Sequence, residues 1–262
     1  MKRLHRKSDT LHSALTMASV LLCAAAILLF YVLPAPVEDE TLGALLSAII
    51  PRFFIAVFLL VIAIEFFPKS VLYRRVSLKG LLWCIPPLLV ALVNFPFSAL
   101  IRGTARIVRL DLLWLFLIKC FLIGLGEELL FRGIIFYSLL EYFKKKEGGL
   151  FFSVLFSSVI FALFHFVNLL DGAGILPVLQ QVGYSFLTGA MFAVVYLKTK
   201  NFCIPVFLHA LFDIGGFLVF DLGEGRPQDL TFWILTVVTG ILCAVHIILT
   251  LVKMMRKKTS SN

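Results

Sequence analysis

The chain has 262 residues, of which 61% are hydrophobic and only 15% are charged. Soluble domains carry about 25% charged residues, so this composition excludes an ordinary soluble domain. It predicts an all-α polytopic membrane protein in which residues 1–262 form a single transmembrane domain. The net charge of +9 does not indicate nucleic-acid binding, because the basic residues lie mostly in short loops and at the two ends, as membrane orientation requires.

The apolar runs predict about eight transmembrane helices that enclose an intramembrane polar cavity. The first run exceeds the length of a signal-peptide core, about 7–15 residues, and is expected to remain as a helix. Pro51 and Arg52 interrupt the second, which favours a short interfacial segment followed by a span. Three prolines predict kinks in the third. The predicted spans are 14–33, 43–67, 80–101, 111–140, 149–170, 174–197, 201–220 and 230–252.

The loops between these spans alternate in charge. Basic residues occupy the N-terminus, the tail and every second loop, whereas acidic residues dominate the other loops. This pattern predicts a multi-pass protein of the cell membrane, surrounded by membrane lipids, with both termini in the cytoplasm. Arg102, Arg106 and Arg109 are the exception, because they fall on the outer side. They indicate either an amphipathic helix in the headgroups or an error in the span count nearby.

Two adjacent acids, Glu127 and Glu128, lie within an apolar stretch and are followed by Arg132. A charge at the centre of a membrane helix costs about 2.5–3.5 kcal/mol even on insertion scales. Glu128 and Arg132 are four residues apart and can pair on one helix face. Glu127 is rotated by about 100° from Glu128 and is left to face elsewhere. One acid therefore fits a structural ion pair, and the other is free for chemistry.

Two later helices carry a histidine each. His165 follows Phe161 by four residues and precedes Asn168, so an aromatic ring is expected beside the imidazole. His209 precedes Asp213 by four residues, a spacing that allows the carboxylate to orient the imidazole. The rise per residue along the predicted helices places His165 nearer the opposite end of the bundle from His209.

A carboxylate and two histidines on three helices form a catalytic set. A glutamate can act as general base toward water, and histidines can share that water or stabilise an oxyanion. The same groups, Glu127, His165 and His209, can also hold a divalent metal such as zinc. The spacing leaves both chemistries open, so the cofactor is either absent or one metal ion.

Three motifs in order, Glu127-Glu128-x-x-x-Arg132, Phe161-x-x-x-His165 and His209-x-x-x-Asp213, resemble those of the CAAX protease and bacteriocin-processing (CPBP, or Abi) family of intramembrane endopeptidases. The resemblance covers about 110–215. It implies an eight-helix fold in which the first glutamate activates water with help from His165. It also implies that His209 and residue 213 stabilise the oxyanion, while Glu128 and Arg132 hold the acid in place.

Position 213 departs from the family, which often has Asn there. A neutral amide can donate a hydrogen bond to an oxyanion, and an ionised carboxylate cannot. Asp213 is therefore expected to be protonated, to orient His209, or to favour cation binding. Orientation of His209 is the preferred interpretation.

The leading hypothesis is an intramembrane endopeptidase acting on a membrane-associated protein or peptide, which in relatives is lipid-modified. A non-proteolytic scaffold or bacteriocin-immunity protein of the same fold is the alternative. A proton-coupled transporter can also use buried Glu and His residues, but the sequence lacks the internal repeats typical of many transporters.

Overall fold

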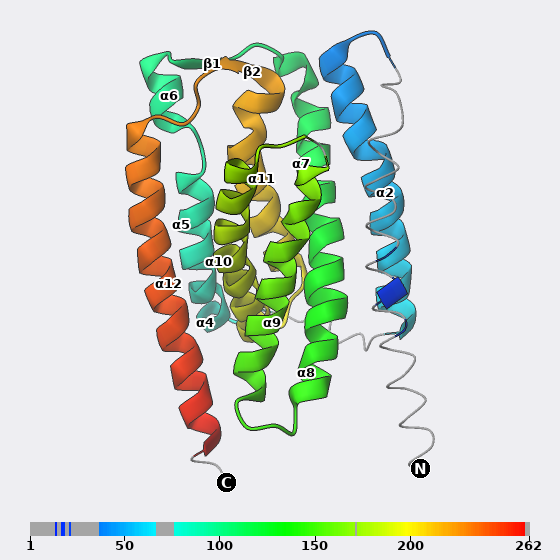
Figure 1. Ribbon diagram of the computed structural model, residues 1–262, viewed down its shortest axis with the longest axis vertical. Coiled ribbons are helices and arrows are strands. Elements are labelled where there is room, and N and C mark those ends of the chain that lie inside the picture. The colour runs from blue at the N-terminus through cyan, green and yellow to red at the C-terminus, as the bar shows by residue number, and fades with distance from the viewer. Residues whose placement is uncertain are drawn as a thin grey trace.

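The computed structural model describes residues 37–66, 76–170 and 172–259, together with Ala14, Met17, Ala18 and Leu21. The all-α prediction is confirmed, because long helices run side by side with only a two-stranded sheet at one end (Figure 1). Within the described residues, six helices are long and apolar enough to cross a membrane. The count of eight is not confirmed, and the expected span 14–33 lies almost wholly outside the described residues.

The helices follow the predicted spans to within a few residues. They are α2 (Glu40–Phe66), α4 (Leu78–Leu81), α5 (Ile85–Val93), α6 (Phe97–Arg102), α7 (Leu113–Glu128), α8 (Tyr137–Phe143), α9 (Gly149–Phe164), α10 (Ile175–Thr199), α11 (Cys203–Leu222) and α12 (Leu230–Thr259). Short 3₁₀ segments cover Leu82–Cys84, Leu110–Leu112 and His165–Leu169, and a π-helical segment covers Leu129–Phe136. The two strands are β1 (Ala105–Ile107) and β2 (Gly223–Gly225).

Prolines act differently in α2 and in the following span. Helix α2 continues through Pro51 without a break, so the prediction of a separate interfacial segment is wrong. The prolines of the third predicted span do interrupt it, as expected. Pro86 and Pro87 occupy the first turn of α5, where a missing N–H costs little, and Pro96 precedes α6.

Helix α7 joins α8 through the π-helical segment, so one helical path runs from Leu113 to Phe143. Long π-helical stretches are rare and often occur at functional sites. All eight residues of this segment are buried. The path therefore carries Glu127 and Glu128 at its middle, immediately before an irregular turn of helix.

The two ends of the bundle differ in charge. Acidic residues lie at the end with β1 and β2, and the α8–α9 loop with its lysines lies at the other end (Figure 1). This separation agrees with the alternating loop charges, although the membrane orientation itself stays a prediction. The bundle is packed through its centre, where α10 lies against α9 and α7 lies against both α2 and α11.

The arginines at 102, 106 and 109 do not form an amphipathic surface helix, which corrects that interpretation. β1 pairs antiparallel with β2, and each arginine meets an acid brought to the same end by another segment. We call this group the ionic cap; its pairs are Arg102–Asp229, Arg106–Glu224, Arg109–Asp39 and Arg109–Asp111.

Hydrogen bonds from Arg109 hold the pKa values of Asp39 and Asp111 below their usual range. The same carboxylates raise the pKa of Arg109, so the guanidinium stays charged throughout. The cap thus ties the start of α2 to the segment before α7, and β2 to β1.

Candidate active site

The two adjacent glutamates face different environments because consecutive helical residues are rotated by about 100°. Glu128 is fully buried, whereas the Glu127 side chain is 26% exposed and lines a cavity. Glu127 Oε2 has no hydrogen-bond partner among the described residues. The division predicted from the sequence, with one acid structural and one free, therefore matches the geometry.

Glu128 pairs with Arg132, as their spacing predicts. Arg132 Nη1 donates to Glu128 Oε1 at 2.8 Å, and Nη2 donates to the carbonyl of Gly189 on α10 at 3.1 Å. The guanidinium also lies over the ring of Phe161, 4.5 Å from its centroid. These contacts link the α7 path to α9 and α10 and fix the carboxylate that follows Glu127.

His209 is held by Glu128 rather than by its helical neighbour Asp213. Its Nδ1 lies 2.8 Å from Glu128 Oε1, which leaves Nε2 on the side of the cavity. Nε2 is 3.6 Å from Glu127 Oε2 and 3.8 Å from Asp213 Oδ2. Both distances exceed a hydrogen bond. Asp213 therefore lies near the free nitrogen, and the preferred interpretation that it orients the ring is not supported. We call Glu128, Arg132 and His209 the buried network.

His165 begins the 3₁₀ segment that follows α9. Its Nδ1 is 2.9 Å from the carbonyl of Phe161. A carbonyl only accepts hydrogen bonds, so Nδ1 carries the proton. Nε2 faces Ser185 Oγ at 3.4 Å, and the ring packs edge-on against Phe161, with centroids 5.0 Å apart. The expected aromatic neighbour is present, and the imidazole is fixed with Nε2 toward the cavity.

Asn168 lies at the cavity wall one turn after His165. Its amide donates to Gln181 Oε1 at 2.7 Å, which joins the 3₁₀ segment to α10. Asn168 thus anchors the segment that carries His165, and the expectation that it supports the site stays a prediction.

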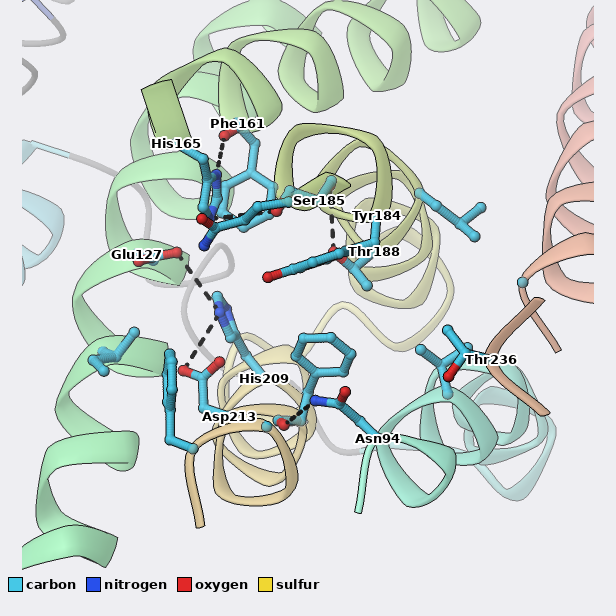
Figure 2. Close-up of a pocket in the computed structure, with 18 of the residues that line it drawn as sticks. Asn94, Glu127, Phe161, His165, Tyr184, Ser185, Thr188, His209, Asp213 and Thr236 are labelled. Atoms are coloured by element: carbon cyan, nitrogen blue, oxygen red, sulfur yellow. Dashed lines mark hydrogen bonds and ion pairs between the residues drawn. The ribbon is translucent and has the colours of Figure 1, made fainter. Parts of the chain in front are cut away.

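One cavity of about 530 Å³ brings the predicted residues together (Figure 2). Glu127, His165, His209 and Asp213 all line it, from α7, the 3₁₀ segment, and α11. Figure 2 places Asn94 and Thr236 at its other end, away from the glutamate. The cavity therefore extends from Glu127 and the two histidines toward α5 and α12.

The expected mismatch in depth between His165 and His209 is absent. Phe161, one turn before His165, lies edge-on to His209 with ring centroids 5.9 Å apart. The α8–α9 hairpin extends further than the α10–α11 turn at the same end of the bundle (Figure 1). Because α9 begins further out at this end of the bundle than α11 does, its last turn lies at the level at which α11 carries His209 (Figure 1).

Several cavity residues were not singled out from the sequence. Ser185, Thr188 and Tyr184 come from α10, and Arg52 comes from α2. Single hydroxyls within an apolar helix give no periodic pattern. Arg52 is a charge within an apolar run and is therefore detectable from the sequence as an unusual residue. Its position beside Pro51 favours an interruption of the span and hides its place at the cavity.

A metal ion is not accommodated by the residues as they are arranged. Across residues 37–66, 76–170 and 172–259, no group of three His, Cys, Asp or Glu side chains is placed to hold one. His165 is turned between the Phe161 carbonyl and Ser185 instead of toward a shared centre. The predicted zinc ligands, Glu127, His165 and His209, therefore do not fit a metal in this geometry.

Comparison with known proteins gives one match. Residues 109–215 match the model of a family described as type II CAAX prenyl endopeptidase Rce1-like. No curated protein and no solved structure matches the chain. The matched segment contains all three motifs, from Glu127 to Asp213, and supports an assignment to the CAAX protease and bacteriocin-processing family.

Proposed function

We propose that the protein is an intramembrane endopeptidase in which Glu127 activates the water that attacks a peptide bond. One observation carries this proposal: Glu127, whose buried Oε2 has no hydrogen-bond partner among the described residues, lines a cavity that two histidines also line. The family match supports a peptide or protein substrate. The family alone does not assign roles to residues, so these are argued from the contacts.

Glu127 is the proposed general base. It accepts a proton from a water in the cavity, and the resulting hydroxide attacks the carbonyl carbon to give a tetrahedral oxyanion. The same proton then passes to the leaving amine as the carbon–nitrogen bond breaks. His165 Nδ1 is occupied by the Phe161 carbonyl, and Nε2 lies 3.4 Å from Ser185 Oγ, so His165 assists this water by exchanging the Ser185 contact for it.

His209 is the proposed oxyanion stabiliser. Its Nδ1 is engaged with Glu128, so only Nε2 remains to interact in the cavity. A protonated ring donates from Nε2 to the developing negative charge, and a donor fixed before the reaction is worth about 2.7–4 kcal/mol in comparable sites. Glu128 and Arg132 serve as positioning residues for this ring.

Asp213 is proposed to help the oxyanion in its protonated form. Its Oδ2 has no hydrogen-bond partner among the described residues and lies on the same side of His209 as Glu127. If the carboxyl donates a proton, Asp213→Asn should retain most activity, because the amide also donates. Asp213→Ala should lose about tenfold or more. Equal activity of all three proteins would remove residue 213 from the mechanism.

The substrate is proposed to be a membrane-associated protein or peptide that reaches the cavity from the lipid, with or without a lipid modification. A protein of the cell membrane with both termini in the cytoplasm would meet such substrates at the end of the bundle that carries the lysines. A non-proteolytic scaffold or immunity protein would have the same fold but would cleave no peptide. A cleavage assay therefore distinguishes this alternative from the endopeptidase.

The test is cleavage of a diverse peptide library by the purified protein in lipid, with products identified by mass spectrometry. We expect Glu127→Gln to abolish cleavage and His165→Ala or His209→Ala to reduce it by 100-fold or more. Glu141→Gln is the matched control, because Glu141 lies at the exposed end of α8 and pairs with Lys144. A chelator arm should leave cleavage intact. Undiminished cleavage by folded Glu127→Gln would refute the mechanism.

A further inference from the structure

Tyr184 brings a phenolic hydroxyl into the cavity that Glu127 lines. It belongs to the apolar helix α10 and is the sole tyrosine among the described residues of the cavity wall. Figure 2 shows its ring extending from α10 toward the space between Glu127 and His209. The hydroxyl therefore points toward the part of the cavity in which the peptide bond is proposed to be cleaved.

The Tyr184 ring is held by Phe212 of α11. The two ring centroids are 5.8 Å apart, with the planes inclined at 51°. The Phe212 carbonyl accepts a hydrogen bond from Asn94 Nδ2 at 2.7 Å, which ties the residue after α5 to this turn of α11. Phe212 lies between His209 and Asp213 on the same helix. The ring is thus packed on the turn of α11 that also carries the proposed oxyanion stabilisers.

The Tyr184 hydroxyl makes no hydrogen bond within the described part of the chain. A tyrosine hydroxyl that lies inside a protein usually finds a hydrogen-bond partner, so this group is available to a bound molecule. The charges of Asp213 and Glu127 both act on the phenol, which agrees with the direction of the ring in Figure 2. A molecule bound between these carboxylates would lie within reach of the hydroxyl.

From this placement we infer that Tyr184 is a further catalytic residue, whose hydroxyl donates a hydrogen bond to the oxyanion of the tetrahedral intermediate. A phenol donates through its O–H group and carries that proton at neutral pH. It reaches the intermediate from α10, whereas His209 donates from α11. The phenol keeps its proton throughout, because the proton from the attacking water is carried by Glu127. The inference rests on the proposed function, since it adds a donor to that reaction.

The first test is Tyr184→Phe, which removes the hydroxyl and keeps the ring that packs on Phe212. We expect kcat for the best-cleaved library peptide to fall about 100-fold, as for the loss of one oxyanion donor. KM should not change, because the hydrogen bond forms only in the transition state. Tyr142→Phe is the matched control, since Tyr142 is 67% exposed on α8 and should be replaceable without loss. Wild-type kcat for Tyr184→Phe, or a rise in KM alone, would overturn the inference.

Binding of a tetrahedral analogue tests the hydrogen bond directly. A peptide phosphinate places a charged tetrahedral group where the cleaved bond would lie. Tyr184→Phe should raise its dissociation constant about 10- to 100-fold, the range of a hydrogen bond to a charged group. The uncleaved peptide, measured in lipid nanodiscs with Glu127→Gln present, should bind equally with and without the hydroxyl. Equal weakening of both ligands, or a lowered unfolding temperature of Tyr184→Phe, would assign the hydroxyl to the fold and overturn the inference.

The kinetic results separate this inference from the proposed function. If Glu127→Gln still cleaves while Tyr184→Phe loses kcat, the general-base proposal fails and the role of Tyr184 stands. If Glu127→Gln is inactive but Tyr184→Phe keeps both kcat and the affinity for the phosphinate, the inference about Tyr184 fails alone. A folded wild-type protein that cleaves no peptide would overturn both.

Discussion

The buried network and the ionic cap use the same residue types in opposite surroundings. In the network, the side chains of Glu128 and Arg132 are 0% and 1% exposed. In the cap, those of Arg106 and Glu224 are 75% and 59% exposed. Both pairs meet at 2.8 Å, so distance does not distinguish them. Desolvation distinguishes the two pairs, because the free energy lost on removing one partner depends on whether water can replace that partner.

The comparison also separates a group of residues that is expected to support catalysis from a group that joins chain segments. In the buried network, Arg132 and His209 both contact Glu128 Oε1, and the network ends at the ring whose Nε2 lies 3.6 Å from Glu127. The cap joins chain segments that meet at one end of the bundle, and its arginines and acids are not among the residues that line the cavity. We therefore expect perturbation of the network to change both stability and catalysis, and perturbation of the cap to change neither by much.

The largest effect is expected from Arg132→Met. Removing the cation leaves Glu128 buried with only the His209 imidazole as a partner, and breaking a buried ion pair in this way costs about 3–5 kcal/mol. Cleavage should fall with stability, because His209 loses the fixed carboxylate that positions it. Chemical unfolding in detergent measures the first effect. The double variant Arg132→Met with Glu128→Leu should recover part of the stability; if it does not, the loss comes from packing rather than from the unpaired charge.

Gly124→Ala should give the second largest effect. A Cβ at this position of α7 would lie 3.0 Å from both Ala210 N and Val206 O of the α11 backbone, so α11 must move away. The expected destabilisation is about 1–3 kcal/mol, with reduced cleavage because Glu128 and His209 separate. Gly126→Ala is the matched control, since a Cβ there meets nothing within 4 Å. Equal effects of the two variants would contradict the close approach of α7 to α11.

Arg106→Met in the ionic cap should have a small effect. Exposed ion pairs contribute about 0–1 kcal/mol, and β1 keeps its backbone pairing with β2 in the variant. Thermal unfolding and peptide cleavage should both remain close to wild type. A loss as large as that of Arg132→Met would show that the cap, despite its exposure, supports the cavity.

The smallest expected effect is an acid-induced loosening of the cap. The pKa values of Asp39 and Asp111 are lowered in the folded protein, so their contribution is complete above the ordinary value near pH 4. It is lost as the pH falls below that value through the folded pKa values. The protection factors for amide exchange at 108–112, taken relative to the intrinsic rate at each pH, should fall in this window in wild type. Protection factors that are equally low at pH 7 would mean that the pairs do not order this segment.

The elements of the fold were predictable because long apolar runs have few alternatives in a membrane. The local pair Glu128–Arg132 was also predictable, since spacing along one helix fixes which side chains meet. Partners from different helices were not. The i,i+4 spacing of His209 and Asp213 favoured a local contact, but α7 packs so closely on α11 that Glu128 supplies the carboxylate instead.

Two other features could not be predicted from the sequence, for different physical reasons. The strands β1 and β2 have three residues each, which is too short for an alternating pattern to appear. Arg52 stands in a helix that continues through Pro51, so local propensity at that point was overridden by packing on α7. In both cases the deciding contacts join residues far apart in the chain.

The π-helical segment after Glu128 determines how the residues of α8 are rotated about the helix axis relative to those of α7. Each residue of a π-helical turn adds less rotation than the roughly 100° of an α-helical residue, so the same eight residues in α-helical form would turn α8 relative to α7. Helix α8 packs along α9, which leads to His165. The π-helical segment therefore allows α7, which carries the acids, to keep its packing on α11 while the α8–α9 hairpin keeps its own orientation.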